Sequence, residues 1–528
     1  MSAGVVMFDL VIRNATVIDG TGVPGRRADV GVRDGRIESI GVLPGETPAA
    51  RTIEAADRVL APGFIDIHTH SDLHLIADGL GESKLRQGVT TEVTGNCSFA
   101  PFPIESARIG LHMDHLARAT APIPLDWSDL DGYARALDRA GLGLNVAPLA
   151  GHGTLRVCAM GVDQRPPNPD ELTRMKRELD RSLEQGAWGL TTGLTHVPSA
   201  YGEFDEVEEL VRLVARHGGL YASHGRASGA VTETVDIGKA TGARVQHSHL
   251  ALNDPAKWGT AAALLADLED AAAAGVDIAF DVYPYVASSS ALTQYLPPWV
   301  QAGGTDAMRA RLSQPTERAR ALRDMAAGWF GGIPFLWDRF TISDSPDGYG
   351  IARTIDDLAA ETDTDPYEFT LSLCERYGNT VGVVLFYRSE TDVEAFLAHP
   401  MGCVGSDGNA VPLRQGSARI HPRSFGTFPR VLGRYVRERG TLSLASAVNK
   451  LSGRPAEVLR LKGRGLIRLG YAADLVLLDP ETVADTTDFG QQPSAPLGID
   501  LVVVNGTVMV DHGVVGTDRP GHVLLRGQ

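Results

Sequence analysis

The chain alternates between two patterns of hydrophobic and polar positions. Over residues 8–60, short runs of alternating apolar and polar residues are separated by Gly, Asp and Pro, as in DLVIRNATVIDG and ADVGVRDGRIESIG. The same pattern returns over 465–528, in GLIRLGYAADLVLLDP and IDLVVVNGTVMVDHGVV. Alternation with a period of two, broken by turn residues, predicts short antiparallel strands. We therefore expect the two ends, 1–61 and 463–528, to pair as one small β-sandwich domain.

The central residues, 62–462, show helical periods that are each followed by a short apolar run. DELTRMKRELDRSLEQG precedes AWGLTTGL, EFDEVEELVRLVARHGG precedes LYASHGR, VTETVDIGKATG precedes ARVQHSHL, and PAKWGTAAALLADLEDAAAAG precedes VDIAFDVYPY. Repeated helix-then-strand units predict an α/β fold with a parallel sheet and crossover helices. A doubly wound open sheet and a closed (β/α)8 TIM-like barrel both satisfy this pattern. The barrel is preferred because the chemically suggestive residues fall at strand ends, where barrel active sites lie.

One long segment, at about residues 286–400, interrupts this rhythm. It predicts an inserted subdomain that covers the substrate. Its aromatic residues either line an apolar pocket or form the core of the subdomain; they are Trp299, Phe330, Phe335 and Trp337.

Composition and charge narrow the class of protein. With 528 residues, of which 43% are hydrophobic, the chain can bury one large core and still form a second domain. The formal net charge of −16 argues against nucleic-acid binding, which uses Lys and Arg clusters. No apolar run is long enough to span a bilayer, and MSAGVVMFDLVIRNATVIDG lacks the features of a secretory signal, so we expect a cytoplasmic location without membrane contact. The sequence does not indicate an oligomeric state, so a monomer and a homo-oligomer are both compatible with it.

The most informative motif is APGFIDIHTHSD, residues 61–72, in which an apolar run ends in His68 and His70. Successive side chains of a strand alternate between its faces, so both imidazoles would leave the strand on one side. Two converging imidazoles are half of a zinc site. The alternative is a buried strand that the histidines merely cap.

Four other residues suited to metal or proton chemistry end predicted strands. Cys97 ends GVTTEVTGNCS, where a thiolate would be a strong zinc ligand and a small buried thiol is the alternative. His224 ends LYASH and His249 ends ARVQHSH, in consecutive helix-strand units. Asp407 ends MGCVGSD, where a carboxylate beside a metal-bound water is placed to take its proton. No G-x-S-x-G elbow is present, which disfavours a serine hydrolase.

The chain resembles the amidohydrolase superfamily, and specifically its D-aminoacylase branch, the N-acyl-D-amino-acid deacylases. The resemblance rests on an ordered series of motifs over nearly the whole length: VIRNATVIDGTG, APGFIDIHTHSD, GVTTEVTGNCSFAP, GHGTLR, AWGLTTGL, YASHGR, HSHL, DVYPY, VGSDG, HPRSFGTFPRVLGRYVRERG, LSGRPAEVLRL and YAADLVLLDP. It implies that Asp407 is the catalytic aspartate. It also implies a set of metal ligands, namely His68, His70, Cys97, His224 and His249.

Zinc is the cofactor that this resemblance implies. Many relatives bridge two metals with a lysine on the fourth strand, but AWGLTTGL contains none, so Cys97 would take the bridging position. One zinc ion would be held firmly by Cys97, His224 and His249. A weaker or partly filled second position would be formed by His68, His70, Cys97 and Asp407. The implied reaction is hydrolysis of the amide bond of a small molecule by metal-activated water, with Asp407 carrying the proton to the departing nitrogen.

Two departures from the branch pattern leave the substrate open. Typical D-aminoacylases carry a carboxylate-binding lysine two residues after the sixth-strand histidine, where this chain has Ala251. Arg423, Arg226 and Lys257 are the candidate replacements. The second departure is His196, which stands where the family usually has a tyrosine that donates a hydrogen bond to the reacting carbonyl. An imidazole can also donate this hydrogen bond, so we expect His196 to have a catalytic role. The alternative is a loop histidine at the rim of the site. Because of these departures, the alternative function is that of an amidohydrolase acting on D-dipeptides, cyclic amides or specialised-metabolite amides. A non-enzymatic scaffold of the same fold is disfavoured, because the set of candidate ligands is complete.

The resemblance also implies a substrate-binding segment. Tyr283 lies at the end of VDIAFDVYPY, and Ser289 follows shortly after it. We expect both to bind substrate together with Arg423 of the HPR motif. A buried tyrosine whose hydroxyl bonds to the backbone is the alternative for Tyr283.

Overall fold

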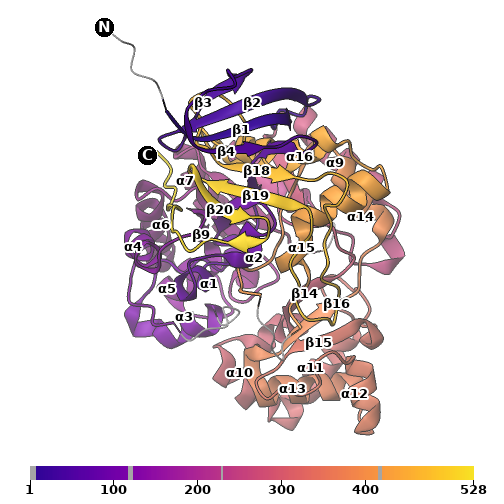
Figure 1. Cartoon of the computed structure of the whole chain (residues 1–528). Coiled ribbons are helices and arrows are strands. Elements are labelled where there is room, and N and C mark those ends of the chain that lie inside the picture. The colour runs from indigo at the N-terminus through magenta and orange to yellow at the C-terminus, as the bar shows by residue number, and fades with distance from the viewer. Residues whose placement is uncertain (1–6, 117–122, 228–229, 414–418, 528) are drawn as a thin grey trace.

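The computed structural model of the chain describes residues 7–116, 123–227, 230–413 and 419–527. Figure 1 shows strands from both ends of the chain together at the top, a mixed body of helices and strands beneath them, and a lobe at the bottom. Among the described residues, no helix combines the length and the apolar character that crossing a bilayer requires.

Strands from both ends of the chain pair in one nine-stranded sheet. The two ends meet where β5 (Val59–Pro62) runs antiparallel to β18 (Leu475–Leu478). The order is β21-β20-β19-β18-β5-β1-β2-β3, with β4 paired to β1. The other strands are β1 (Phe8–Val17), β2 (Arg26–Arg33), β3 (Arg36–Gly41), β4 (Ala49–Glu54), β19 (Ile499–Val504), β20 (Thr507–Asp511) and β21 (Val514–Val515). Hydrogen bonds thus connect all nine strands, rather than dividing them into the two sheets of the expected sandwich.

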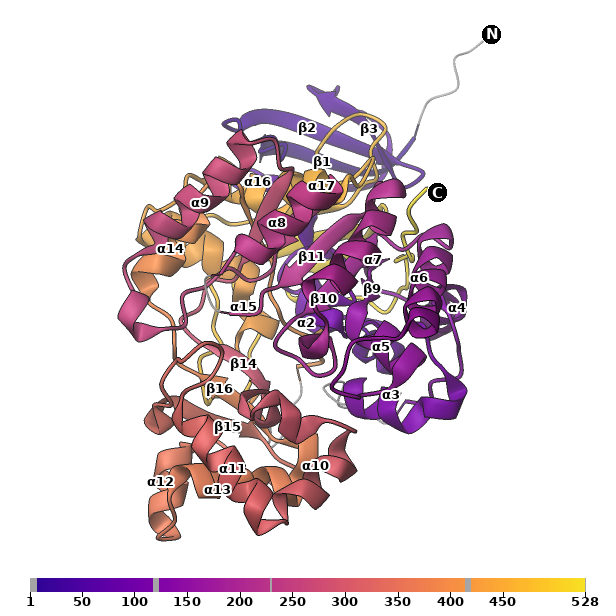
Figure 2. The same cartoon turned by 180° about the vertical axis from the view of Figure 1, so that it is seen from behind.

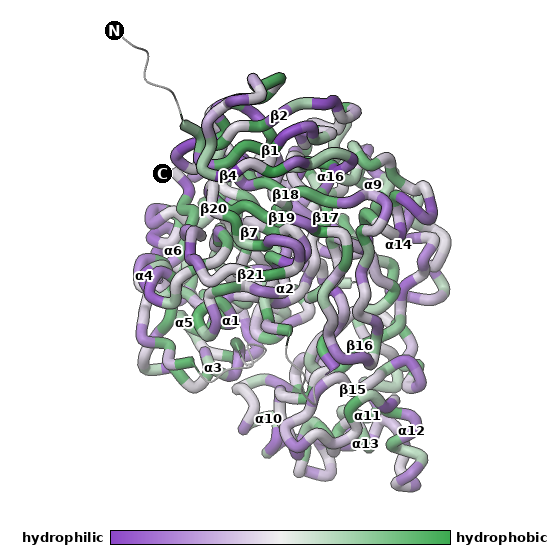
Figure 3. Tube along the Cα trace, viewed as in Figure 1, coloured by the Kyte–Doolittle hydropathy of each residue, from purple (hydrophilic) through white to green (hydrophobic). Residues whose placement is uncertain are grey.

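Successive side chains of β18 and β19 pack alternately into two different cores, as the period of two in the sequence requires. Val30, Leu501 and Val503 belong to a core that lies within the sheet region. Figure 3 shows β18 and β19 as largely hydrophobic segments, because these strands are covered on both faces.

The strands of the central part are all parallel and form two ladders. One contains β6 (Phe64–Asp66), β7 (Val89–Thr94) and β8 (Asn145–Pro148). The other runs in the order β17-β13-β12-β11-β10-β9 and contains β9 (Ala150–Gly151), β10 (Gly189–Gly193), β11 (Leu220–His224), β12 (Arg244–His247), β13 (Ile278–Val282) and β17 (Gly402–Val404). A single residue separates β8 from β9, and an isolated parallel bridge joins Thr69 to Gly408. The hydrogen-bonded ladder is therefore not continuous around a closed barrel.

Amphipathic helices connect these strands and cover them; α7 and α8 lie over β10 and β11 in Figure 2. In α6 (Pro169–Glu184), Asn168 and Glu171 form a capping box, in which each side chain accepts a hydrogen bond from the backbone N–H of the other. One face of this helix buries Met175 and Leu179 in the main core. The other helices of the central part are α1 (His74–Ala77), α2 (Glu82–Leu85), α3 (Ile109–Leu116), α4 (Leu130–Ala140), α5 (His152–Met160), α7 (Phe204–Arg216), α8 (Thr232–Thr241), α9 (Ala261–Ala273), α14 (Glu390–Ala398), α15 (Arg423–Arg430), α16 (Leu444–Leu451) and α17 (Gly453–Leu459).

The lobe at the bottom of Figure 1 is the predicted insertion. It contains an antiparallel sheet of β14 (Ser288–Ala291), β16 (Gly382–Leu385) and β15 (Phe340–Asp344), with α10 (Thr305–Leu312), α11 (Pro315–Ala326), α12 (Ile355–Glu361) and α13 (Pro366–Tyr377). Phe335 and Trp337 belong to its own core. Val393 and Phe396 of α14 belong to the main core instead, so the separately packed segment ends before α14 and short of residue 400.

Candidate metal centre

Six side chains singled out in the sequence converge at the carboxyl ends of the parallel strands. They are His68 and His70 after β6, Cys97 in the short helix η1 (Asn96–Ser98) after β7, His224 at the end of β11, His249 after β12, and Asp407 after β17. The carboxyl edge of a parallel sheet is where α/β folds build their active sites, because the strands there end side by side. The structure thus brings together every metal-ligand candidate and the candidate catalytic aspartate.

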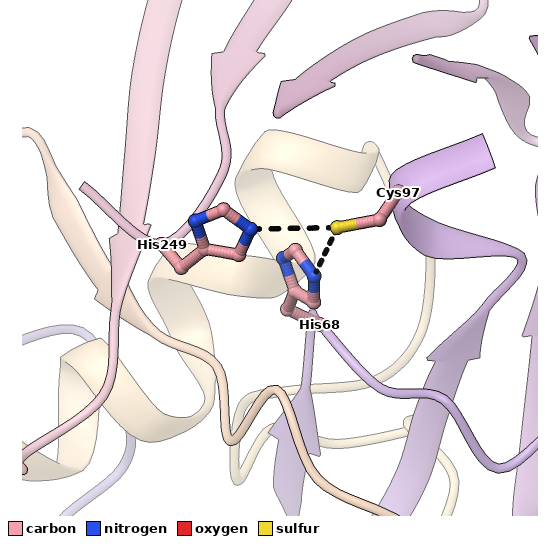
Figure 4. Close-up of side chains that lie close together, drawn as sticks. All are labelled: His68, Cys97 and His249. Atoms are coloured by element: carbon pink, nitrogen blue, oxygen red, sulfur yellow. Dashed lines mark hydrogen bonds between the residues drawn. The ribbon is translucent and has the colours of Figure 1, made fainter. Parts of the chain in front are cut away.

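The thiol of Cys97 lies at the centre of this cluster. Its Sγ is 3.3 Å from Nε2 of His68, 3.4 Å from Nε2 of His249 and 3.6 Å from Nδ1 of His224; Figure 4 shows the first two contacts. The side chain is only 2% exposed. Burial is the largest single influence and opposes ionisation, but His68 and His249 outweigh it and hold the pKa of the thiol well below its usual range. Cys97 is therefore set up as a thiolate.

Three groups of potential ligands share this space among the described residues, each with its ligand atoms within 4.8 Å of one another. They are His68, Cys97 and His249; Cys97, His196 and His224; and His68, His70 and Asp407. Thiolate, imidazole and carboxylate are the donors that zinc prefers, so the residues fit the implied metal. Because Cys97 and His68 each belong to two groups, the cluster can form adjoining positions that share a ligand.

Three of the converging residues have left-handed backbone conformations. The φ angles of Cys97, His249 and Asp407 are +50°, +37° and +52°, a region that costs energy for residues with a Cβ. Hydrogen bonds hold two of them there: the amide of His249 donates to Oδ1 of Asp281 at 2.9 Å, and the amide of Asp407 donates to the carbonyl of His68 at 2.8 Å. The backbone of His249 has therefore already left the ladder of β12, which ends two residues earlier than the sequence predicts.

Asp281 is a site residue that the sequence analysis did not identify. Its carboxylate is fully buried within β13 and lies 3.2 Å from Nδ1 of His68. It also accepts hydrogen bonds from Nε2 of Gln246 at 2.5 Å and from the amide of His249. A carboxylate behind a ligating imidazole fixes its orientation and frees the other ring nitrogen for the metal. The available signal was an aspartate inside the otherwise apolar run IAFDV.

His196 lies at the edge of the cluster, in one group of potential ligands with Cys97 and His224. Its ring centroid is 4.6 Å from that of His224 and 4.9 Å from that of Phe99. Nε2 of His224 is 2.6 Å from Oγ1 of Thr195, which holds that ring from behind. His196 is thus buried beside a candidate ligand and at the wall of the cavity above the cluster.

Asp407 lies between one of the imidazoles and a guanidinium. Its Oδ1 is 2.9 Å from Nε2 of His70, and its Oδ2 is 2.8 Å from Nη1 of Arg423. Burial is the largest influence and opposes ionisation, but Arg423 and then His70 outweigh it and hold the pKa of the carboxyl group well below its usual range. Asp407 is therefore an ionised carboxylate whose Oδ1 faces the cluster.

A cavity of about 750 Å³ opens above the cluster. All three predicted substrate-binding residues, Tyr283, Ser289 and Arg423, line it. The lobe supplies the opposite wall, which includes Trp329 and Phe330. The volume falls within the range of small-molecule sites, so the geometry accommodates an amino-acid derivative with a sizeable substituent.

A buried ion network lies beneath the cluster and ties the ends of β6 and β17 together. Nζ of Lys84 is 2.8 Å from Oδ2 of Asp66, 3.2 Å from Oε1 of Glu92 and 2.7 Å from Oγ of Ser406. Asp66 also accepts a hydrogen bond from the amide of Ser406 at 2.8 Å. Asp66 and Ser406 lie two residues before His68 and one before Asp407, respectively. The network therefore fixes the strand ends from which two site residues project.

We expect Lys84→Met to lower the free energy of unfolding by about 3–5 kcal/mol, because it leaves two buried carboxylates without their cation. Urea denaturation monitored by circular dichroism measures this change. Lys176→Met is the matched control: Lys176 pairs with Glu209 at the surface, where such a pair contributes no more than about 1 kcal/mol. Equal losses for the two variants would show that the buried network does not stabilise the fold.

Comparisons with known proteins place this geometry in a family. Residues 51–311 and 353–510 match the sequence profile of the amidohydrolase family, and residues 2–53 match that of the urease alpha-subunit N-terminal domain. An N-acyl-D-glutamate deacylase of Alcaligenes xylosoxydans xylosoxydans is 37% identical, over 98% of this chain and 97% of its own. A D-aminoacylase of the same organism is 34% identical over 98% of both chains.

Solved structures agree with these sequence matches. The crystal structure of N-acyl-D-glutamate deacylase from Bordetella bronchiseptica, in complex with zinc and a phosphonate mimic of the tetrahedral intermediate, superposes with a TM-score of 0.82 at 35% identity and covers 98% of this chain and 100% of that one. A structure of D-aminoacylase that addresses its binuclear metal centre has a TM-score of 0.82 at 33% identity and the same coverage. The resemblance noted in the sequence is thus confirmed: this chain has the mixed α/β fold of the amidohydrolases and belongs to the amidohydrolase family, in its D-aminoacylase branch.

Proposed function

We propose that this chain is a zinc-dependent amidohydrolase that removes the acyl group from N-acyl-D-amino acids. The observation that carries the proposal is the cluster centred on Cys97, with ionised Asp407 beside it, at the floor of a cavity. The full-length relatives named above are deacylases of N-acyl-D-glutamate and a D-aminoacylase, which supports the same substrate class.

Asp407 is the proton carrier in this proposal. The chemistry that a bound zinc ion supplies is the acidification of water and the polarisation of a carbonyl group. Oδ1 of Asp407, which faces His70, accepts the proton of the attacking water, and Asp407 then delivers that proton to the departing nitrogen, which needs it to leave as an amine. Arg423 keeps the carboxylate ionised until the water attacks. His196 donates a hydrogen bond to the oxygen of the reacting carbonyl.

The residues also support an unequal pair of metal positions. We place one firmly held zinc ion on Cys97, His224 and His249. A weaker second position uses His68, His70, Cys97 and Asp407. Asp407 is already paired with the guanidinium of Arg423, which repels a cation and weakens that carboxylate as a ligand. The relatives are described as zinc-bound and as having a binuclear centre, which supports both positions.

The fold around this site is proposed to be one (β/α)8 barrel that carries a terminal β domain. The short gap between β8 and β9 and the bridge between Thr69 and Gly408 are where the two ladders adjoin, which supports closure. In this division the β domain comprises 1–61 and 463–528, and the barrel domain comprises 62–462 with its inserted lobe.

A second candidate function is hydrolysis of a different amide at the same centre, such as a D-dipeptide, a cyclic amide or a specialised-metabolite amide. It is favoured by Ala251, which lines the cavity where the family has a lysine, and by His196 in place of a tyrosine. The loss of the lysine removes a cation that would pair with a substrate carboxylate.

A substrate panel separates the two candidates. We expect the zinc-loaded protein to hydrolyse N-acetyl-D-amino acids and to leave the L-enantiomers, D-dipeptides and cyclic amides largely unchanged, as measured by release of the free amine. Dialysis against a chelator should abolish this activity and zinc should restore it. Turnover of dipeptides or cyclic amides without turnover of any N-acyl-D-amino acid would overturn the deacylase proposal in favour of the second candidate.

A further inference from the structure

Arg388 is a buried cation in the cavity wall that the sequence analysis did not identify. It follows β16 and precedes α14, and it is 8% exposed. Its Nε donates a hydrogen bond to Oδ1 of Asn253 at 3.3 Å. Its buried Nη1 donates none to any residue that the structure describes. A buried guanidinium with an unused donor is costly, so this arrangement suits a ligand that supplies the missing acceptor.

The ring of Tyr283 lies between Arg388 and Arg423. Their guanidinium carbons are 4.1 Å and 4.9 Å from its centroid. The hydroxyl of Tyr283 is buried and likewise has no hydrogen-bond partner in the described part of the chain. Two cations and an unused hydroxyl donor therefore gather at one wall of the cavity.

The charges that the described residues place at this wall do not balance. Arg423 forms an ion pair with Asp407. Arg388 forms no ion pair with a carboxylate of the residues described; its described contacts are Asn253 and Tyr283. Within the described ranges, one buried positive charge is thus left over. An anion that enters the cavity would neutralise it, and a carboxylate matches the planar geometry of a guanidinium.

Arg388 also lies beside the segment from which the family lysine is missing. Ala251 and Asn253 both line the cavity, and Asn253 is the residue that holds Nε of Arg388. Two of the replacements suggested by the sequence do not line this cavity. Arg226 pairs with Glu233 at 2.9 Å and donates to the carbonyl of Gly202, and Lys257 is exposed on the surface.

We propose that Arg388 binds a carboxylate of the amino-acid half of the substrate, with the hydroxyl of Tyr283 as a second donor, and so replaces the cation lost at position 251. This inference rests on the proposed deacylase function and deepens it, because it assigns a carboxylate to the amino-acid part of the substrate. The carboxylate comes either from the α-carbon or from an acidic side chain, and the substrates chosen for the test distinguish these sources.

The first experiment compares substrates with and without the charge. Arg388→Met should raise KM for N-acetyl-D-leucine and N-acetyl-D-phenylalanine by about 10- to 100-fold, with a smaller effect on kcat, because a charged hydrogen-bonding partner is lost. It should affect hydrolysis of the corresponding carboxamides much less. Arg388→Lys should recover part of the loss. The matched control is Arg339→Met, since Arg339 contacts the carbonyl of Phe386 but does not line the cavity.

The same variants identify the source of the carboxylate. A loss that affects every N-acetyl-D-amino acid assigns Arg388 to the α-carboxylate. A loss seen with N-acetyl-D-glutamate but not with N-acetyl-D-glutamine assigns it to the side-chain carboxylate. An equal loss for acids and carboxamides would mean that Arg388 only supports the fold, and would overturn the inference.

A binding measurement keeps this test separate from the proposed function. Isothermal titration calorimetry on the metal-free protein gives dissociation constants for the same acids and carboxamides without turnover. Tighter binding of the acids by the wild type, abolished in Arg388→Met, supports the inference even if the zinc-loaded enzyme hydrolyses neither. Failure of the wild-type chain to prefer acids over carboxamides overturns it, whatever reaction the enzyme performs.

Discussion

Replacing Cys97 with alanine is expected to remove the firmly held zinc ion and to lower kcat by about 10³-fold or more. The thiol lies within 3.6 Å of three imidazoles, so its loss would open both proposed metal positions at once. The remaining candidate ligands would be neutral imidazoles and one carboxylate, without the thiolate that compensates the charge of zinc. The missing polarisation of substrate and water is worth several kcal/mol of barrier, at about 1.4 kcal/mol for each tenfold in rate.

Zinc content by elemental analysis and kcat on the best N-acetyl-D-amino acid are the two measurements. Cys374→Ala is the matched control, because Cys374 is also a buried free thiol but lies in the separate core of the lobe. This control should lose some stability through the cavity it creates and keep its zinc. A Cys97→Ala protein with full zinc and full activity would remove Cys97 from the metal centre.

The sequence predicts that the candidate ligands lie together, because local rules place them. His68 and His70 follow an apolar strand, and the side-chain period of a strand directs both to one side. Cys97 and Asp407 each closely follow a parallel strand, so the topology brings them to one edge of the sheet. These approximate placements follow from strand order, whereas packing between distant segments is not revealed by a single sequence.

The residues that the sequence did not identify act through contacts between distant segments. Asp281 belongs to the same apolar run as Tyr283, yet its contact with His68 spans 213 positions of the chain. Arg388 follows an apolar strand with no motif around it, and its role depends on Tyr283 and Asn253. The same cause accounts for α14, which follows the lobe along the chain and which only packing assigns to the main core.

Asp407→Asn is expected to keep the firmly bound zinc and to lower kcat by about 10²- to 10⁴-fold, the usual contribution of a positioned general acid or base. Asparagine has nearly the same shape and can still contact His70 and Arg423, but its amide neither accepts a proton at neutral pH nor delivers one to a leaving nitrogen. The variant should keep its zinc ion because, in the proposed site, Cys97, His224 and His249 hold it without Asp407. The measurements are zinc content and kcat at saturating substrate.

Asp29→Asn is the matched control for this last variant. Asp29 is a buried aspartate that accepts hydrogen bonds from the amides of Asn14 and Leu43 in the end sheet, well away from the cavity. Its substitution should affect stability and leave kcat unchanged. An unaltered kcat in Asp407→Asn would exclude Asp407 as the proton carrier. Joint loss of zinc and activity would make it a ligand of the firmly held metal instead, because only in that case does the metal depend on its charge.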